Sequence, residues 1–551
     1  MKHMAEKYYP YLLALLAGLF LLPFLGKVHL FDWDEINFAE SAREMLVTGD
    51  YLRVRVGFLP FWEKPPFFFW LQAASMHIFG VNEFAARFPN AMFGAITLVT
   101  LYVIGKKEKN ARFGLLWSLL YFSSLLPHLY FKSGIIDPVF NYFIFTAVYF
   151  LLKTSRHDAH RMRNATIAGV LIGLAVITKG PVGFLLLLLT YLVVLVLEKF
   201  KELPRMKDVA VFALAAFAVS FMWYGVEVLA HGPWFLVEFI RYQIGLFSQP
   251  VAGHAQPFYY HFVVVLVGCF PMSVFGIGGL ARQAGADYLG RWMKALFWVV
   301  MILFTLVTTK IIHYSSMAYF PLSYLAARYV YHKATRQSKP GKAMMAGYIF
   351  VGLVLGLALT ALPLVVYFID DIKPFIHDPF AVAGLSAPVS WSGYACLVGV
   401  LFILAVVISA ILLARAGIIK ALGVMGAGLV VSLLLFSAFI LPKIEQHTQG
   451  PLINFLVSVQ GEDVYVTTSG FHSYAPFFYF RQPDDNLDKR ADKAWLATGK
   501  IDKPVYIITK ITDTYIASLP DVELIKEEGG YRFYKRQPEE QDGPENSGPN
   551  H

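Results

Sequence analysis

The sequence predicts an α-helical polytopic membrane protein with a small α/β domain at its carboxyl end. Of its 551 residues, 57% are hydrophobic and only 15% are charged, whereas soluble domains carry about 25% charged residues. Apolar runs long enough to cross a bilayer recur along residues 1–441. From residue 442 onward the composition becomes that of a soluble domain.

Thirteen apolar runs are predicted to span the membrane as helices. They cover residues 8–25, 87–105, 113–131, 138–152, 165–178, 181–197, 209–229, 260–280, 293–309, 314–331, 343–369, 393–413 and 420–441. The first run follows Lys2 and Lys7 but lacks a small-residue cleavage site, so we expect a retained span. The fifth run is short and ends at Thr178-Lys179-Gly180-Pro181. Such a break is tolerated at membrane depth only beside protein or a water-filled cavity.

Clusters of Lys and Arg indicate how the chain is oriented. Four even-to-odd connections carry them, at residues 106–112, 153–163, 199–207 and 333–342. These connections lie on the same side as the N-terminus, and the positive-inside rule makes that side cytoplasmic. The C-terminus then lies outside. The net charge of +9 is explained in this way without a nucleic-acid partner.

The first outer connection, residues 26–86, is long, acidic and rich in tryptophan. Asp34–Leu46 and Phe67–Phe79 are predicted to be amphipathic helices at the membrane surface, the second begun by Pro65-Pro66. Trp33 and its neighbouring tryptophans suit the headgroup level.

Carboxylates of this connection are candidates for chemistry. Asp34 and Glu35 sit beside a membrane end, where a carboxylate can accept a proton from a hydroxyl or bind a metal. Glu63 and His254 would make a mixed oxygen and nitrogen pair suited to zinc or a similar divalent ion. The two cysteines, Cys269 and Cys396, lie in apolar runs, which argues against a disulfide framework.

A set of cations lies at the outer ends of several spans, on the side that should carry few. These are Lys64, Lys132, Lys179, Arg241 and Lys310. As a set they indicate an anion site, and phosphate at the membrane surface is its natural ligand. Asp137, at the start of the fourth span, is expected either to pair with a lysine or to be functional.

Residues 442–536 are predicted to form the small α/β domain, and residues 537–551 a disordered tail. The expected strands are Asp463–Thr467, Lys503–Ile508 and Tyr531–Tyr534, and the expected helices are Ser473–Phe480 and Thr512–Ser518.

A series of short motifs runs collinearly through residues 1–440. They are Asp34-Glu35, Phe38-Ala39-Glu40, Gly49-Asp50-Tyr51, Glu63-Lys64-Pro65-Pro66, Glu83–Pro89, Ile136-Asp137-Pro138, Thr178–Pro181, His254 ahead of Gln256–Tyr260, and Lys310–Tyr314. Together they resemble the bacterial GT-C glycosyltransferases, which include the lipid A aminoarabinose transferases (ArnT) and the protein O-mannosyltransferase group. The likeness extends to the thirteen-span count and the outer α/β domain.

The resemblance implies an inner-membrane enzyme that moves a sugar from a polyprenyl (undecaprenyl) phosphate to a periplasmic acceptor, with inversion. The acceptor would be lipid A or another envelope glycan or lipid. It implies that Asp34 is the main catalytic carboxylate, with Asp137 and Glu35 as further acids of the site. The groups expected to hold the donor phosphate are Lys64, Lys179, Arg241, Lys310 and Tyr314. Glu63 and His254 match positions that resemble a metal site of the aminoarabinose transferases.

Two alternatives stay open. Asn37 and Phe38 stand where the aminoarabinose transferases usually have Arg and Tyr. The missing arginine removes a cation near the acceptor and leaves room for a hydroxyl on protein, so a protein O-glycosyltransferase is the first alternative. A flippase for lipid-linked sugars is the second. Transporters tend to have two similar halves with paired broken helices, whereas this chain has one large asymmetric loop.

Overall fold

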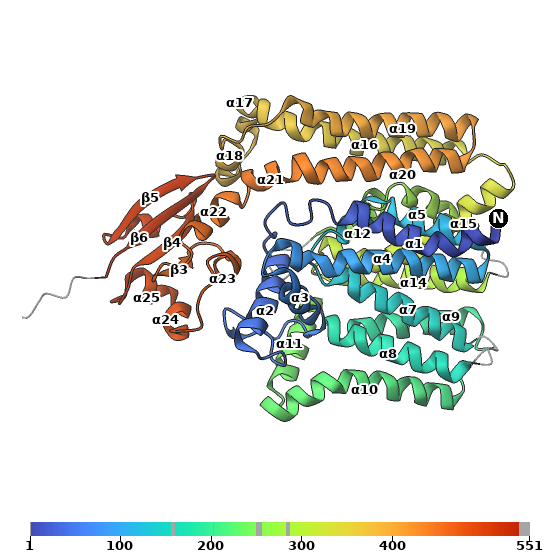
Figure 1. Ribbon diagram of the computed structural model, residues 1–551, viewed down its shortest axis with the longest axis horizontal. Coiled ribbons are helices and arrows are strands. Elements are labelled where there is room, and N and C mark those ends of the chain that lie inside the picture. Colours follow the sequence, from blue (N-terminus) through green and yellow to red (C-terminus); the bar gives the residue numbers. More distant parts are fainter. Residues whose placement is uncertain (1, 156–159, 202, 249–255, 283–286, 539–551) are drawn as a thin grey trace, which may run out of the picture.

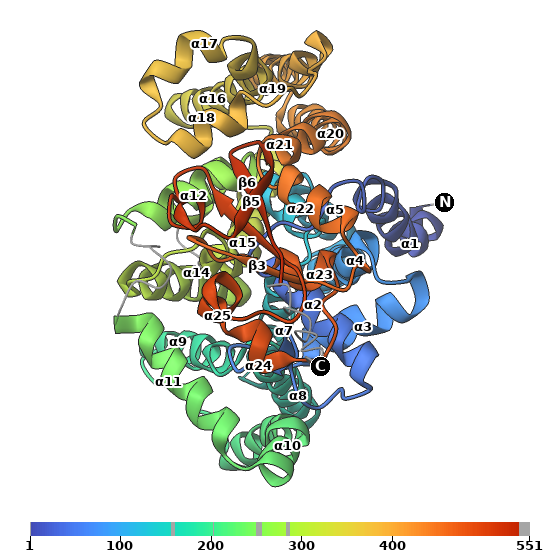
Figure 2. The same ribbon diagram turned by 90° about the vertical axis from the view of Figure 1, so that its left-hand side faces the viewer.

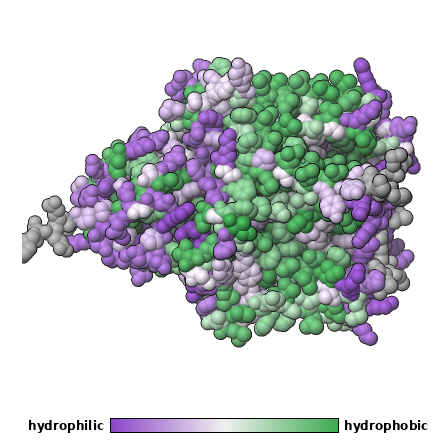
Figure 3. Space-filling model, in the orientation of Figure 1, coloured by the Kyte–Doolittle hydropathy of each residue, from purple (hydrophilic) through white to green (hydrophobic). Residues whose placement is uncertain are grey.

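The computed structural model describes residues 2–155, 160–201, 203–248, 256–282 and 287–538. Long helices lie side by side in a bundle, and a small α/β domain sits at one end of it (Figure 1). On the face shown in Figure 3, a hydrophobic band crosses the bundle between two polar ends. This is the pattern expected of a protein whose central part lies in a bilayer.

Each predicted span coincides with one helix or with two consecutive helices. The helices of the bundle that correspond to these spans are α1 (Lys2–Leu21), α4 (Glu83–Glu108), α5 (Ala111–Phe122), α7 (Asp137–Ser155), α8 (Arg161–Lys179), α9 (Val182–Leu197), α10 (Met206–His231), α12 (Tyr260–Gly268), α13 (Met272–Ala281), α14 (Tyr288–Leu306), α15 (Tyr319–Thr335), α16 (Lys342–Tyr367), α19 (Leu397–Arg415) and α20 (Ile418–Leu435). Among the described residues, seven helices are long and apolar enough to cross a membrane, or eight if α12 and α13 form one broken span. The count of thirteen therefore stays a prediction.

Three predicted spans are not single straight helices. The run 113–131 divides into α5 and the short α6 (Leu125–Tyr130), because Ser124 adopts an extended backbone. The run 260–280 bends by 117° between α12 and α13, where Pro271 has no N–H to continue the helix. The run 314–331 begins inside a 3-10 helix, Ile312–Ala318, and becomes α-helical only at α15.

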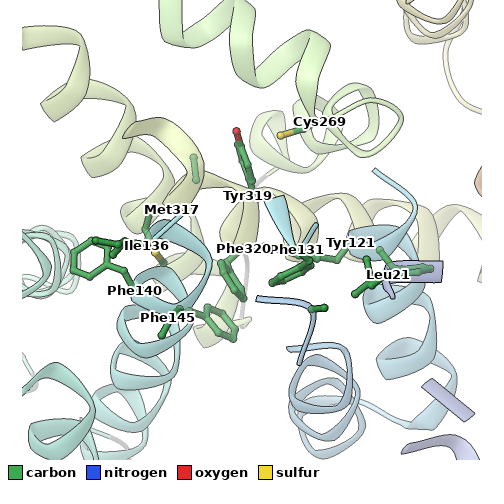
Figure 4. Packing of buried hydrophobic residues seen from close by; sticks show 14 of the residues in the cluster. Leu21, Tyr121, Phe131, Ile136, Phe140, Phe145, Cys269, Met317, Tyr319 and Phe320 are labelled. Atoms are coloured by element: carbon green, nitrogen blue, oxygen red, sulfur yellow. The ribbon is translucent and has the colours of Figure 1, made fainter. Parts of the chain in front are cut away.

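Buried aromatic rings join the helices beneath the outer end of the bundle. Phe145 of α7 stacks on Phe320 of α15 with ring centroids 4.6 Å apart. Tyr121 of α5 contacts the same Phe320 ring at 5.0 Å. Figure 4 shows these rings converging with Phe131 between the three helices. Closely packed rings resist displacement, so these contacts hold the three helices firmly together.

The N-terminus lies at the end of the bundle opposite the α/β domain (Figure 1). Lys106, in the first basic connection, pairs with Glu6 of α1 at 3.3 Å. That basic connection therefore lies at the N-terminal end of the bundle, as the span order predicts.

The first-loop helices are confirmed as α2 (Asp34–Thr48) and α3 (Phe67–Phe79). Between them is a short hairpin of β1 (Arg55–Val56) and β2 (Leu59–Pro60). The expectation that α2 lies at the membrane surface is wrong, because every residue from 35 to 45 is buried. The helix ends at Gly49, whose φ of 70° suits a residue without a Cβ.

The carboxyl-terminal sheet has the strand order β3-β4-β6-β5. Its strands are β3 (Tyr465–Thr468), β4 (Val505–Lys510), β5 (Val522–Glu528) and β6 (Tyr531–Arg536). β3 and β4 are parallel, and the other pairs are antiparallel. Strand β5 was not predicted, because this edge strand is largely solvent-exposed and its residues are mostly polar.

Short helices complete the α/β domain and its junction. They are α18 (Pro379–Leu385), α21 (Leu441–His447), α22 (Gly450–Ser458), α23 (Ala475–Tyr479), α24 (Leu487–Ala491) and α25 (Lys493–Thr498), whereas α11 (Trp234–Ser248) packs beside α10 and α17 (Ile369–Ile372) follows α16. The predicted helix 473–480 corresponds to α23, and the predicted helix 512–518 is reduced to the 3-10 turn Ile516–Ser518. Helix α20 continues through a π-helical turn into α21, so no loop marks the boundary at residue 442. The predicted disordered tail lies outside the described residues from 539 onward.

Candidate active site

A cavity of about 910 Å³ opens between the first loop and the outer ends of the bundle helices. Seven of the residues predicted to act in catalysis, phosphate binding or metal binding line it. They are Asp34, Glu35, Glu63, Lys64, Asp137, Lys179 and Tyr314. Residues far apart in the chain thus meet at one polar cavity, at the end of the bundle that carries the α/β domain.

Helix ends position the charged groups of the cavity. Asp34 and Asp137 are the first residues of α2 and α7, and Lys179 is the last residue of α8. Helix dipoles favour acids at N-termini and cations at C-termini. The three side chains therefore suit their places in the backbone before any ligand binds.

His313 lies between the two aspartates. Its Nε2 is 3.8 Å from Asp34 Oδ2 and 3.9 Å from Asp137 Oδ2. Lys179 donates a hydrogen bond of 2.7 Å to Asp137 Oδ1. The Asp137 side chain is 6% exposed, whereas that of Asp34 is 35% exposed. Asp34 is therefore the carboxylate that a hydroxyl from outside can reach, and Asp137 holds Lys179 and His313 in place.

Cations and phenols form the other wall of the cavity. The Lys64 Nζ lies 3.7 Å from Glu63 Oε2 and 5.2 Å from the centre of the Tyr242 ring. The Lys179 Nζ lies 5.4 Å from the centre of the Tyr314 ring. These groups can donate hydrogen bonds to an anion, and phosphate fits this donor set.

Lys132 also lines the cavity, but its ammonium group is already engaged. It donates to the Leu21 and Pro23 carbonyls at 2.9 and 2.7 Å. It thereby satisfies carbonyls at the end of α1, so its role is structural.

Two residues predicted to bind the donor phosphate are not brought to the cavity. The Lys310 side chain is buried and donates to the Val307 carbonyl at 2.9 Å. Arg241 is 71% exposed and pairs with Glu238 at 2.5 Å. Tyr242, the next residue of α11, faces the cavity instead. Successive helix residues point about 100° apart, which is how Tyr242 reaches the cavity while Arg241 is exposed.

Glu35 is a buried anchor, which corrects its predicted place among the catalytic acids. Its oxygens accept hydrogen bonds from Arg87 Nε and Nη2 at 3.0 and 2.7 Å. They also accept from the backbone N–H groups of Phe31 and Gly134. Burial raises the pKa of Glu35, but Arg87 and these donors outweigh it and the pKa is lowered. No lone pair is left for a substrate proton.

Comparison with known proteins shows which enzymes this chain is similar to. A family model described as dolichyl-phosphate-mannose-protein mannosyltransferase matches residues 63–223. The undecaprenyl phosphate-alpha-4-amino-4-deoxy-L-arabinose arabinosyl transferase of Pectobacterium carotovorum is 27% identical over 410 residues, covering 70% of each chain. The corresponding Pseudomonas fluorescens transferase 2 is 27% identical over 330 residues, covering 57% of this chain and 58% of its own.

Solved structures agree with the sequence relatives. ArnT from Cupriavidus metallidurans bound to undecaprenyl phosphate superposes with a TM-score of 0.74 at 16% identity, over 95% of this chain and 97% of that one. At this identity the likeness shows the fold. The chain is thus similar in sequence to the aminoarabinose transferases and shares the GT-C fold of ArnT. It is therefore a glycosyltransferase.

In this GT-C enzyme the predicted metal pair is only half described. Glu63 lines the cavity, whereas His254 lies outside the described residues. No group of three or more His, Cys, Asp or Glu side chains suited to a metal occurs in the described part of the chain. The metal site remains a prediction.

Sequence reasoning missed two residues that shape the GT-C site. His313 bridges the two aspartates, but in the sequence it is only the neighbour of Tyr314. Arg87 neutralises Glu35, but in the sequence it is only part of the Glu83–Pro89 motif. The roles of His313 and Arg87 become visible only when the side chains that they meet in the folded protein are known.

Proposed function

We propose that this chain is an inner-membrane glycosyltransferase that transfers a sugar from undecaprenyl phosphate to lipid A. The observation that carries the proposal is the pairing of an accessible Asp34 carboxylate with a cationic wall in one cavity. The names of the aminoarabinose transferases and the undecaprenyl phosphate bound to the similar ArnT structure support this donor and acceptor.

The cationic wall would receive the donor phosphate. As the bond between the anomeric carbon and the phosphate oxygen breaks, its electron pair moves to that oxygen. Lys64, Lys179 and the Tyr314 hydroxyl line the cavity where this charge develops. Preorganised donors that face developing charge stabilise the transition state more than the ground state.

Asp34 would act on the acceptor. A sugar hydroxyl beside its carboxylate loses its proton to Asp34 as the oxygen attacks the anomeric carbon. Attack from the side opposite the departing phosphate inverts the configuration at that carbon. The His313 imidazole lies 3.8 Å from the Asp34 carboxylate, close enough to influence it electrostatically.

The sequence argument for a protein acceptor loses its basis. Asn37 is 2% exposed and is not among the residues that line the cavity. An asparagine at this position therefore removes no cation from the cavity wall. Lipid A is favoured, and a protein hydroxyl is the second candidate because the matching family model describes a protein mannosyltransferase.

Substitution of Asp34 tests the proposal. Asp34→Asn is expected to reduce kcat/KM by about 10²–10⁴, the usual contribution of a general base. The measurement is transfer by protein reconstituted in liposomes, from an undecaprenyl phosphate-linked aminoarabinose donor to lipid A, followed by mass spectrometry. Asp371→Asn, at an exposed site away from the cavity, is the control. Full activity of a folded Asp34→Asn protein would refute the role.

We also propose the predicted orientation, with the N-terminus in the cytoplasm and the cavity and α/β domain in the periplasm. The basic connection beside α1 lies at the opposite end from the cavity, as the positive-inside rule requires. Alkaline phosphatase, which is active only in the periplasm, should be active when fused after residue 536 and inactive when fused after residue 110. The reverse result would overturn the orientation.

A divalent ion held by Glu63 and His254 is the last part of the proposal. The two side chains would supply one oxygen and one nitrogen ligand. Chelation and Glu63→Gln should then each lower the rate of transfer, and metal analysis of the purified protein should show less bound ion in the variant. If transfer and metal content are unchanged in both cases, Glu63 is not a ligand.

A further inference from the structure

The cavity has an aromatic wall next to Asp34 that the proposed mechanism does not use. Trp33, the residue before Asp34, lines the cavity and is 44% exposed. Its ring lies 4.9 Å from the His472 ring and 5.6 Å from the Tyr474 ring. The last two rings meet edge to face at 4.7 Å. The first loop and the α/β domain thus build one cluster together.

Backbone contacts hold this aromatic cluster in place. Asp32 accepts a hydrogen bond of 3.2 Å from the Tyr474 N–H, and its own N–H donates to Gln449 at 3.1 Å. Both bonds join the first loop to the carboxyl-terminal region. The backbone next to Trp33 is therefore ordered before a ligand arrives, which lowers the entropy cost of binding.

The surroundings of Trp33 do not match those of a membrane anchor. A tryptophan at the headgroup level turns its ring toward lipid, whereas this ring packs on the α/β domain and on the cavity. His472 is exposed beside it. Burial lowers the pKa of His472, so its neutral imidazole can both donate a hydrogen bond to a hydroxyl and accept one.

We propose that Trp33, His472 and Tyr474 form a platform on which a sugar ring of the acceptor stacks, with its hydroxyl presented to Asp34. This inference rests on the proposed function and specifies the acceptor side of the same site. The apolar C–H face of a pyranose complements an aromatic face, and the hydroxyls at its rim complement an imidazole. The phosphate-binding groups Lys64 and Lys179, which also line the cavity, remain for the donor.

The test measures KM for each substrate separately. Trp33→Leu keeps an apolar side chain but removes the ring, and it should raise KM for lipid A about tenfold, the loss equivalent to about 1.4 kcal/mol of binding. Its KM for the donor should not change. Trp33→Phe should recover much of the affinity, and His472→Ala should raise KM for lipid A. Trp62→Leu removes an exposed indole from the same loop and is the control.

Two outcomes separate this inference from the proposed function. If the wild-type protein transfers sugar to lipid A and Trp33→Leu leaves KM for lipid A unchanged, the platform is refuted and the function stands. If the wild-type protein transfers nothing to lipid A, the function fails. Calorimetric titration with the deacylated glucosamine disaccharide of lipid A then decides. Weaker binding to Trp33→Leu than to wild type supports the platform, and equal or absent binding refutes it.

Discussion

Glu35→Gln should damage the fold rather than the chemistry. The glutamine keeps the size of the side chain but removes the charge that faces Arg87, whose side chain is 3% exposed. Breaking a buried pair by removing one partner costs about 3–5 kcal/mol, a large share of the roughly 5–15 kcal/mol that stabilises a typical domain. Because the pKa of Glu35 is lowered from 4.5, its contribution is present above pH 4.5 and is lost as the pH falls through the folded value.

The consequence reaches Asp34 through the loop before it. Arg87 also donates to the backbone carbonyls of Leu25, Val28 and His29. An uncompensated guanidinium should disturb this segment, and Asp34 begins the helix that follows it. Transfer by Glu35→Gln should therefore fall together with thermal stability.

A double variant separates anchoring from catalysis. Glu35→Gln with Arg87→Gln removes both charges, and such a replacement is far less costly than removing one. Stability should recover in part, and transfer should recover with it. The measurements are thermal unfolding in detergent, followed by tryptophan fluorescence, and transfer to lipid A. If Glu35→Gln is as stable as wild type but inactive, and the double variant is also inactive, Glu35 is catalytic and the reasoning is wrong.

Two matched pairs of variants test other parts of the site. Lys64→Ala should weaken binding of undecaprenyl phosphate about tenfold to a hundredfold, since hydrogen bonds to charged groups contribute about 1.5–3 kcal/mol. Arg241→Ala, at an exposed position, should leave this binding unchanged. Equal effects of the two variants in a direct binding assay would contradict the assignment of Lys64. Glu44 is buried beside Glu40, and burial and the Glu40 carboxylate raise its pKa from 4.5 to about 9. Between these pH values the folded state holds a proton that the unfolded state releases, so the stability of the fold falls as the pH rises from 4.5 toward 9. Glu44→Gln should therefore match or exceed the wild type in thermal unfolding at neutral pH, by a margin that grows toward pH 9. Glu40→Gln should destabilise, because it removes the charge that faces Arg43 and replaces one of the two oxygens that accept hydrogen bonds of 2.7 Å from it; the opposite order would show that Glu44 is ionised.

Much of the fold could be predicted from patterns within short stretches of the sequence. Hydropathy over about 20 residues marks a span wherever its neighbours lie, so the spans and both first-loop helices could be placed. The alternation of strands is equally local, and it located β3, β4 and β6. It failed for β5, whose exposed side chains leave no apolar period.

The sequence by itself predicted a polytopic membrane protein that resembles the GT-C glycosyltransferases, and it selected most of the acids and cations from which the site is built. The tertiary structure decided what each of them does. Asp34 and Glu35 are neighbours in the chain, yet the Asp34 carboxylate is partly exposed beside His313, whereas the Glu35 carboxylate is buried against Arg87 of α4. Arg241 and Tyr242 divide in the same way. Adjacent helical residues point in different directions, and the partner that each one meets is supplied by a distant span, so only the packing of the helices assigns the roles.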